Sequence, residues 1–268
     1  MPHPALFLAF ALFALVPPAT ARAEGVDVGQ PSALRKLVPA DQLEAAAGRE
    51  YHTLIRQAAA KKALAPETHP QLRRLRAIAA RIIPHATRFN PRAASWQWEI
   101  NLIGSRQINA FCMPGGKIAL YTGLVDGLKL SDDEIAVIVG HEIAHALREH
   151  ARERMAKTGL TQLGATLIGE LIGGGRYTDA FQFGGELLAL KFSRNDETEA
   201  DVVGLELAAR GGFNPAAGIT LWQKMGAANR GEPLVWFSTH PSGPNRIKEI
   251  ERQLPQVMPL YERAAGGR

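Results

Sequence analysis

Two histidines and a glutamate fall within five consecutive residues, His141-Glu142-Ile143-Ala144-His145. On a helix, residues four apart face the same side, so both imidazoles could reach one Zn²⁺ ion at about 2.0–2.1 Å. Glu142 would then lie next to a water molecule bound to that ion. Because zinc lowers the pKa of bound water towards about 7, a neighbouring carboxylate can take its proton. The segment therefore predicts one hydrolytic zinc site with Glu142 as the base.

The third zinc ligand is not expected from the same helix. Catalytic zinc sites use three protein ligands and keep a fourth position open. In the extended pattern H-E-x-x-H-x-x-G-x-x-H, Gly and His would be required where Arg148 and Ala151 stand. His150 follows His145 by five residues and would lie off the ligand face of a continuous helix. The third ligand must therefore come from elsewhere in the chain.

Glu197 is the best candidate for that ligand. It shares a helix face with Asp201, four residues on, where a carboxylate could accept the distal N–H of a ligand histidine. Glu199 would point about 200° away from Glu197, and Val203 follows it where an acid would be needed. An acidic helix start favoured by the helix dipole would explain Asp196 and Glu197, but it gives Asp201 no role.

The helices that must position these groups are marked by capping signals. Ser131 with Glu134 three residues on forms a capping-box sequence and predicts a helix that runs to about Lys157. Ser193, again with an acid three residues on, predicts a second helix that ends at residues 211–212. The Gly-rich residues between these helices, 173–185, are expected to be mobile. Further helices are predicted at residues 41–64, 70–83, 215–228 and 244–254, and strands at residues 96–103, 108–112 and 117–122.

A predicted β-hairpin immediately precedes the first of these helices. Met113-Pro114-Gly115-Gly116 joins its two strands, and glycine supplies the positive φ that a tight reversal needs. An extended peptide commonly binds by adding to the edge of a sheet, and one of these strands is a candidate edge for a peptide substrate. The candidate substrate-binding residues are Asn109, Ala110, Phe111, Gly115 and Gly116.

The N-terminus has the pattern of an export signal. Residues 5–16 form an unbroken apolar run, which is short for a membrane span but suits the core of a signal peptide. Small residues at positions 21 and 23 predict cleavage before Glu24, with positions 19 and 21 as a second option, and an uncleaved anchor is the alternative. No cysteine follows the run, so a lipoprotein attachment point is not expected. We expect residues 1–23 to be a signal peptide, and residues 24–268 to be one periplasmic domain with a helical region at about 40–84 and no transmembrane helix.

Charge and cysteine content exclude several classes of function. The formal net charge of +5 is small and scattered, which is compatible with an anionic membrane surface or acidic partners and argues against nucleic acid. Cys112 is the only cysteine, so neither an intrachain disulfide nor a thiolate zinc site is possible. We expect Cys112 to be a buried, inert thiol.

Several stretches together resemble the forty-eighth metallopeptidase family, which includes the HtpX, Oma and Ste-type CAAX prenyl endopeptidases. The H-E-x-x-H segment is followed about 50 residues later by Ser193-Arg194-x-x-Glu197-x-x-Ala200-Asp201. The other matching stretches are Asn109-Ala110-Phe111 with Pro114-Gly115-Gly116 and Thr122-Gly123-Leu124, Gly212-Phe213-Asn214-Pro215, and Ser238-Thr239-His240-Pro241 with Arg246-Ile247. The resemblance covers roughly residues 70–255.

The resemblance implies an α+β, mostly helical, zincin-like fold of the gluzincin type, with a small β-sheet beside the zinc-binding helix. It implies a zinc endopeptidase with one Zn²⁺ ion that acts on proteins, often in quality control at an envelope membrane. Misfolded proteins and peptides, including outer-membrane and membrane-associated proteins, are then the expected partners. The chain lacks the transmembrane helices of the HtpX and CAAX branches, so a prenylated substrate is not expected. It looks closest to the soluble periplasmic branch of Gram-negative bacteria, without tetratricopeptide repeats.

The resemblance also implies active-site roles for His240 and Arg246. His240 could stabilise the oxyanion, or it could fill the open position of zinc and hold the resting enzyme inactive; a loop histidine that only binds backbone is the third reading. Two other functions compete with an endopeptidase. A chaperone or binding protein with a structural or idle zinc site would have no use for Glu142, and an exopeptidase would need a group for a substrate terminus, which we do not identify.

Overall fold

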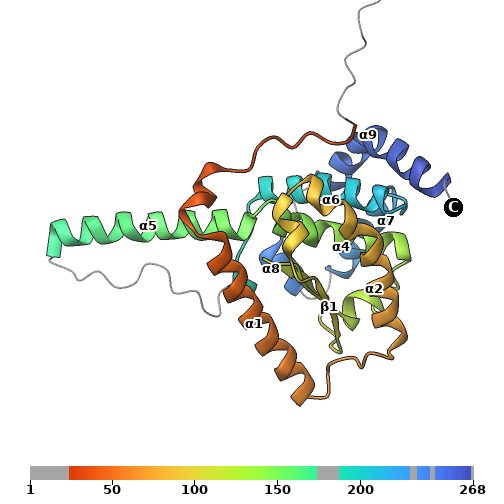
Figure 1. Ribbon diagram of the computed structural model, residues 1–268, viewed down its shortest axis with the longest axis horizontal. Coiled ribbons are helices and arrows are strands. Elements are labelled where there is room, and N and C mark those ends of the chain that lie inside the picture. The colour runs from red at the N-terminus through yellow and green to blue at the C-terminus, as the bar shows by residue number, and fades with distance from the viewer. Residues whose placement is uncertain (1–23, 174–186, 230–233, 242–244, 267–268) are drawn as a thin grey trace, which may run out of the picture.

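Helix α4 (Asp132–Leu147) lies at the centre of the fold, and every residue of it from Glu134 onwards is buried (Figure 1). The computed structural model describes residues 24–173, 187–229, 234–241 and 245–266. The predicted capping box is present: the Glu134 backbone N–H donates to Ser131 Oγ, and the Ser131 backbone N–H donates to the Glu134 carboxylate at 2.8 Å. This box satisfies N–H groups that a helix start leaves without intrahelical partners.

The prediction that this helix continues to about Lys157 is wrong. Helix α4 ends at Leu147, Glu149 adopts a left-handed conformation with φ 58°, and α5 (His150–Gly173) starts a new direction and extends away from the other helices (Figure 1). A left-handed non-glycine residue costs of order 1 kcal/mol or more and persists only where its surroundings hold it. Here Arg35 Nε lies 2.6 Å and Arg152 Nη1 2.7 Å from the Glu149 carboxylate.

Helix α6 (Arg194–Arg210) packs against α4 through glycine. A Cβ atom on Gly204 would lie 2.6 Å from the His141 backbone nitrogen, and one on Gly140 would lie 2.6 Å from the Gly204 carbonyl oxygen. Only residues without a side chain permit this approach of two backbones. The second predicted capping box, at Ser193, is also present and starts α6 where the sequence indicated. The close contact brings the acidic first turns of α6 against the histidines of α4.

A three-stranded sheet lies beside α4, with β1 (Glu99–Ile103), β2 (Ala110–Met113) and β3 (Lys117–Tyr121) in the order β1-β3-β2. β3 pairs in parallel with β1 and antiparallel with β2. The predicted hairpin joins β2 to β3, and Gly115 and Gly116 have φ 83° and 78°. β2 is therefore an edge strand, and it contacts α4.

Other elements surround this centre. They are η1 (Ala33–Leu37), α1 (Ala40–Ala60), α2 (Pro70–Ile82), η2 (Ile83–Arg88), η3 (Pro91–Ser95), α3 (Thr122–Val125), η4 (Leu187–Ala189), α7 (Ala217–Ala228), α8 (Val235–Thr239) and α9 (Arg246–Gly266). The fold is thus mostly helical with one small sheet, as predicted. Among the described residues, no helix combines the length and the apolar character needed to cross a membrane. The predicted signal peptide and nearly all of the predicted mobile segment lie outside the described residues.

Helix α9 is longer than predicted. The sequence prediction ended it at Leu254, yet the helix continues through Pro255 and Pro259. Each proline removes one intrahelical hydrogen bond. Both prolines lie on the exposed face, so water can bind the carbonyl groups that they leave without a partner, while Val257 and Leu260 hold the opposite face in the core.

Candidate active site

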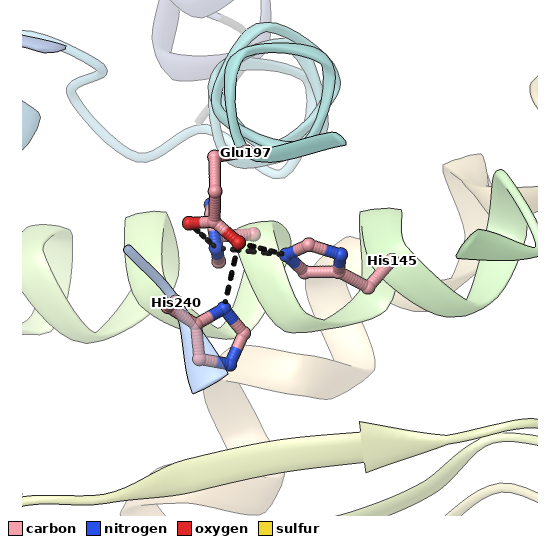
Figure 2. A group of neighbouring side chains, drawn as sticks. His145, Glu197 and His240 are labelled. Atoms are coloured by element: carbon pink, nitrogen blue, oxygen red, sulfur yellow. Dashed lines mark hydrogen bonds and ion pairs between the residues drawn. The ribbon is translucent and has the colours of Figure 1, made fainter. Parts of the chain in front are cut away.

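Four buried side chains, those of His141, His145, Glu197 and His240, direct ligand atoms to a common point, and these atoms all lie within 4.8 Å of one another. Glu197 points from α6 between His145 and His240 (Figure 2). The Nε2 atoms of His141 and His145 are 3.1 Å apart, and they lie 3.6 and 3.3 Å from the Glu197 carboxylate. Tetrahedral zinc with bonds of about 2.0–2.1 Å separates its ligand atoms by roughly 3.3 Å. The donor set and its spacing therefore fit one zinc ion.

A second layer of contacts fixes the His141 side of this cluster. His141 Nδ1 lies 3.0 Å from Asp201 Oδ1, one turn of α6 beyond Glu197. Arg246, the first residue of α9, donates to Asp201 Oδ2 at 2.8 Å and to Glu197 Oε2 at 2.7 Å. Its guanidinium also lies over the Trp222 ring, 3.6 Å from the ring centroid. Arg246 thus joins both acids.

The charge state of Glu197 is set by competing effects. Burial by itself raises the pKa of this carboxyl, but hydrogen bonds from His145 and His240 and the charges of the histidines outweigh burial and hold its pKa well below the usual range. For Arg246, burial lowers the pKa, and the carboxylates of Asp201 and Glu197 raise it above its usual value. Glu197 is therefore ionised and acts only as an acceptor, as a metal ligand must.

Glu142 lies beside the cluster, and only one of its two carboxylate oxygens is hydrogen-bonded by the described residues. It is 2% exposed, and its Oε1 has no hydrogen-bond partner among the described residues. The nearest ionisable nitrogen, His240 Nε2, is 3.9 Å away. Burial, followed by the charge of Glu197, raises the pKa of Glu142 well above its usual range, while a hydrogen bond from the Cys112 backbone lowers it. A carboxyl group in this environment is suited to exchanging a proton with a reacting water.

A cleft of about 420 Å³ opens in front of Glu142 and His145. Its walls are largely apolar and come from β2, from residues 187–192 and from residues 235–240. Three of the candidate substrate-binding residues, Asn109, Ala110 and Phe111, line it. Gly115 and Gly116 do not line the cleft: they form the turn of the hairpin, where Gly116 packs against the Trp98 ring. Cys112, which we expected to be buried, lines the cleft and is only partly buried.

Three residues at the site were missed by sequence reasoning. Phe192 stacks on His145 with ring centroids 3.9 Å apart, and its backbone N–H donates to Thr239 at 3.0 Å. His150 lies with its Nδ1 2.9 Å from His145 Nδ1, although a continuous helix would have turned it away. Glu199 is not among the clustered ligand atoms, but it contacts His150 at 2.8 Å. Nothing in the local sequence marks Phe192, whereas His150 became accessible to His145 only through the break at Glu149.

The family model for Peptidase family M48 matches residues 71–254, which is more than half of the chain and includes the whole cluster. This chain belongs to peptidase family M48. That assignment confirms the resemblance seen in the sequence and agrees with the zincin-like arrangement of histidines and glutamate. Peptidases of family M48 use zinc, and the clustered side chains can hold one ion.

Curated relatives in this family include proteases from distant organisms. The mitochondrial metalloendopeptidase OMA1 of Schizosaccharomyces pombe is 37% identical over 163 residues, which cover 60% of this chain and 48% of the relative. The metalloprotease LoiP of Escherichia coli is 28% identical over 153 residues, or 56% of this chain and 60% of the relative. The beta-barrel assembly-enhancing protease of Yersinia pestis is 25% identical over 183 residues, or 63% and 37%. The chain thus spans about half or less of the length of the OMA1 and beta-barrel assembly-enhancing relatives.

Proposed function

We propose that this chain is a zinc-dependent endopeptidase in which Glu142 is the catalytic base. The observation that carries the proposal is Glu142 Oε1, which has no hydrogen-bond partner in the part of the chain that the structure describes; it is buried beside a histidine–carboxylate cluster and faces a peptide-sized cleft. A structural zinc site has no use for such a group. Membership of a peptidase family and the metalloprotease relatives give further support.

The roles of the individual residues follow from their positions. His141, His145 and Glu197 would hold the ion, and bound zinc supplies Lewis-acid chemistry that polarises a carbonyl group and acidifies water. Glu142 takes a proton from the attacking water and later donates it to the nitrogen of the leaving amine. Asp201 fixes the orientation of His141 through the hydrogen bond at Nδ1, and Arg246, acting through Asp201 and Glu197, keeps both carboxylates in place.

Substrate binding is proposed to use the outer edge of β2, which pairs with no other strand among the described residues. An extended peptide added there would form backbone hydrogen bonds, which give affinity without choosing a sequence. Asn109, Ala110 and Phe111 lie on this side of the cleft. The apolar walls favour peptide segments with hydrophobic side chains, which misfolded proteins expose.

His240 is proposed to restrain the resting enzyme. Its Nδ1 lies 3.0 Å from Glu197 Oε1, and it is the fourth member of the ligand cluster, where a catalytic zinc keeps an open position. A substrate carbonyl and His240 would therefore compete for one place. A donor that stabilises the oxyanion is the other role that this location permits.

Glu142→Gln is the experiment that tests the proposed activity. The substitution keeps the shape of the side chain and removes its ability to take a proton, so zinc content should stay unchanged and casein cleavage should fall by roughly 10²- to 10⁴-fold. Zinc content, the thermal unfolding midpoint and casein hydrolysis are measured on both proteins. Full activity in a clean preparation of Glu142→Gln would disprove the role of Glu142. Zinc binding by the wild type without any hydrolysis would point to a binding protein or chaperone instead.

We further propose that the protein is exported to the periplasm, with residues 1–23 as a cleaved signal peptide and residues 24–268 as one domain. The sequence pattern at the N-terminus supports this proposal, and misfolded envelope proteins, including membrane-associated ones, are the proposed substrates. The intact mass of protein from the periplasmic fraction should correspond to a chain that starts at Glu24. A full-length mass or a cytoplasmic location would contradict it.

A further inference from the structure

The two histidines of α4 are supported in different ways. His141 Nδ1 lies against a carboxylate, that of Asp201, at 3.0 Å. His145 Nδ1 instead lies 2.9 Å from the Nδ1 atom of another imidazole, that of His150. His150 is 2% exposed, and its second nitrogen, Nε2, lies 2.8 Å from Glu199 Oε2. Each histidine is thus linked to a carboxylate. His141 contacts Asp201 directly, whereas the His150 imidazole lies between His145 and Glu199.

Only one arrangement of protons satisfies every contact on the His145 side. His145 directs Nε2 into the ligand cluster, so a metal-binding His145 carries its proton on Nδ1. This proton can be donated only if His150 Nδ1 accepts it. His150 then carries a proton on Nε2 and donates it to Glu199. The three side chains therefore form a hydrogen-bonded relay with a single direction.

We propose that His150 and Glu199 are positioning residues that fix the tautomer and the ring orientation of His145 for zinc binding. The inference rests on the proposed function, in which His145 is a zinc ligand. Partners of this kind usually accept directly from the ligand histidine, as Asp201 does for His141. On the His145 side the carboxylate acts through His150, because Glu199 lies on the far side of α6 from Glu197 and does not join the ligand cluster.

The far end of the relay is itself held in place. Arg148, 4% exposed, donates to the Glu199 carboxylate from its Nε atom and also donates to the carbonyl oxygens of Val28 and Gly29 at 3.2 and 2.9 Å. The relay therefore connects His145 to the N-terminal segment, whose Val26 N–H donates to Glu206 of α6. A residue that only filled space at position 150 would not require this chain of oriented donors and acceptors.

The break between α4 and α5 makes the relay possible. Residues five apart on a continuous helix are rotated by about 140°, which would carry His150 away from His145. The left-handed Glu149 interrupts the helix at this point, and the imidazole of His150 lies against His145. The strained residue thus has a consequence for the zinc site and not only for the path of α5.

The test compares His150→Leu with His150→Gln in the full-length protein. Leu cannot accept the His145 proton, so zinc affinity should fall by about 10- to 100-fold, measured by competition with a chromogenic chelator. Gln offers an oxygen that accepts and an N–H group that donates, so it should recover most of the affinity. The visible spectrum of the Co²⁺-substituted protein should shift with Leu and return towards the wild-type spectrum with Gln. His85→Leu, which removes a partly buried imidazole on η2, controls for the loss of a histidine as such.

Two results would overturn the relay. The first is a zinc affinity of His150→Leu equal to that of the wild type. The second is an equal loss of zinc affinity in His150→Leu and His150→Gln, which would mean that His150 acts by packing alone. If His150→Leu does not fold, Glu199→Ala carries the same test, since it leaves His150 without an acceptor and should weaken zinc binding. If the wild type binds zinc and cleaves casein, and all these variants have the same zinc affinity as the wild type, only the relay is refuted. The proposed function is then unaffected. A wild type that binds no zinc would refute the proposed function itself.

Discussion

The two sides of the candidate active site are built by opposite means. On the metal side, α4 and α6 touch through Gly140 and Gly204, and the carboxylates of Glu197 and Asp201 are each bonded by Arg246. On the cleft side, β2 is an edge strand of the sheet that the described residues form, and it faces short pieces of chain at residues 187–192 and 235–240. The comparison suggests that groups which must not move are held between closely packed helices. A surface that must accept varied peptides uses apolar walls and the backbone N–H and C=O groups at the edge of a sheet.

The most severe test of this contrast concerns His240, because it belongs to the cleft side yet contacts Glu197 on the metal side. If His240 blocks the open position in about 90–99% of molecules, His240→Ala should raise basal proteolysis by roughly 10- to 100-fold. Initial rates of casein cleavage at equal zinc content measure the effect. His85→Ala, which removes a histidine of η2 that belongs neither to the ligand cluster nor to the cleft lining, should leave the rate unchanged.

The opposite outcome would reassign His240. A fall in turnover of roughly 10²-fold would identify it as an oxyanion donor and would place it functionally on the metal side. An unchanged rate would show that His240 is a loop histidine without an active-site role. No residue of the cleft side would then be known to act on the metal side.

Gly204→Ala tests whether close helix packing holds the metal side. The added methyl group would meet the His141 backbone nitrogen at 2.6 Å, and since neither backbone can yield locally, the helices must separate. We expect a loss of about 1–3 kcal/mol in the free energy of unfolding, together with weaker zinc binding, because His141 and Glu197 lie on different helices. Urea unfolding and chelator competition measure these two effects.

Gly226→Ala is the matched control for this substitution. Gly226 also lies within a helix, α7, but a Cβ atom there would have no heavy atom within 4 Å. This variant should be unchanged or more stable by up to about 1 kcal/mol, because alanine favours the helix. Equal behaviour of the two variants would show that the contact between α4 and α6 does not position the site.

Peptides with methylated backbone nitrogens probe the cleft side and should have the smallest effect. Each hydrogen bond lost at the β2 edge removes about 0.5–1.5 kcal/mol, so KM should rise by roughly 2- to 12-fold while kcat changes little. Because strand residues alternate in direction, the effect should appear at every second residue, and methylation at the intervening residues serves as the control. Uniform effects, or a bound peptide lying against residues 40–84, would exclude binding at this edge.

Much of this protein was determined by local rules that a sequence displays directly. Helix periodicity alone indicates that His141 and His145 share a face, and the structure places them with their Nε2 atoms 3.1 Å apart. The capping boxes at Ser131 and Ser193 start their helices as predicted, because side chain and backbone satisfy each other within three residues. The family and the mostly helical fold were predicted from the resemblance that these motifs carry, and both are confirmed.

Other features depend on contacts between segments that are distant in the sequence, and only the tertiary structure reveals them. The left-handed Glu149 is unfavourable by itself, and its side chain is bonded by Arg152 and by Arg35, more than a hundred residues away along the chain. This break moves His150 next to His145, which no helical spacing could indicate. Helix α9 likewise passes Pro255 because packing of its buried face outweighs one lost hydrogen bond. Spacing determines which side chains share a face of one element, whereas the free energy that holds strained backbone and joins separate elements comes from burial and long-range ion pairs.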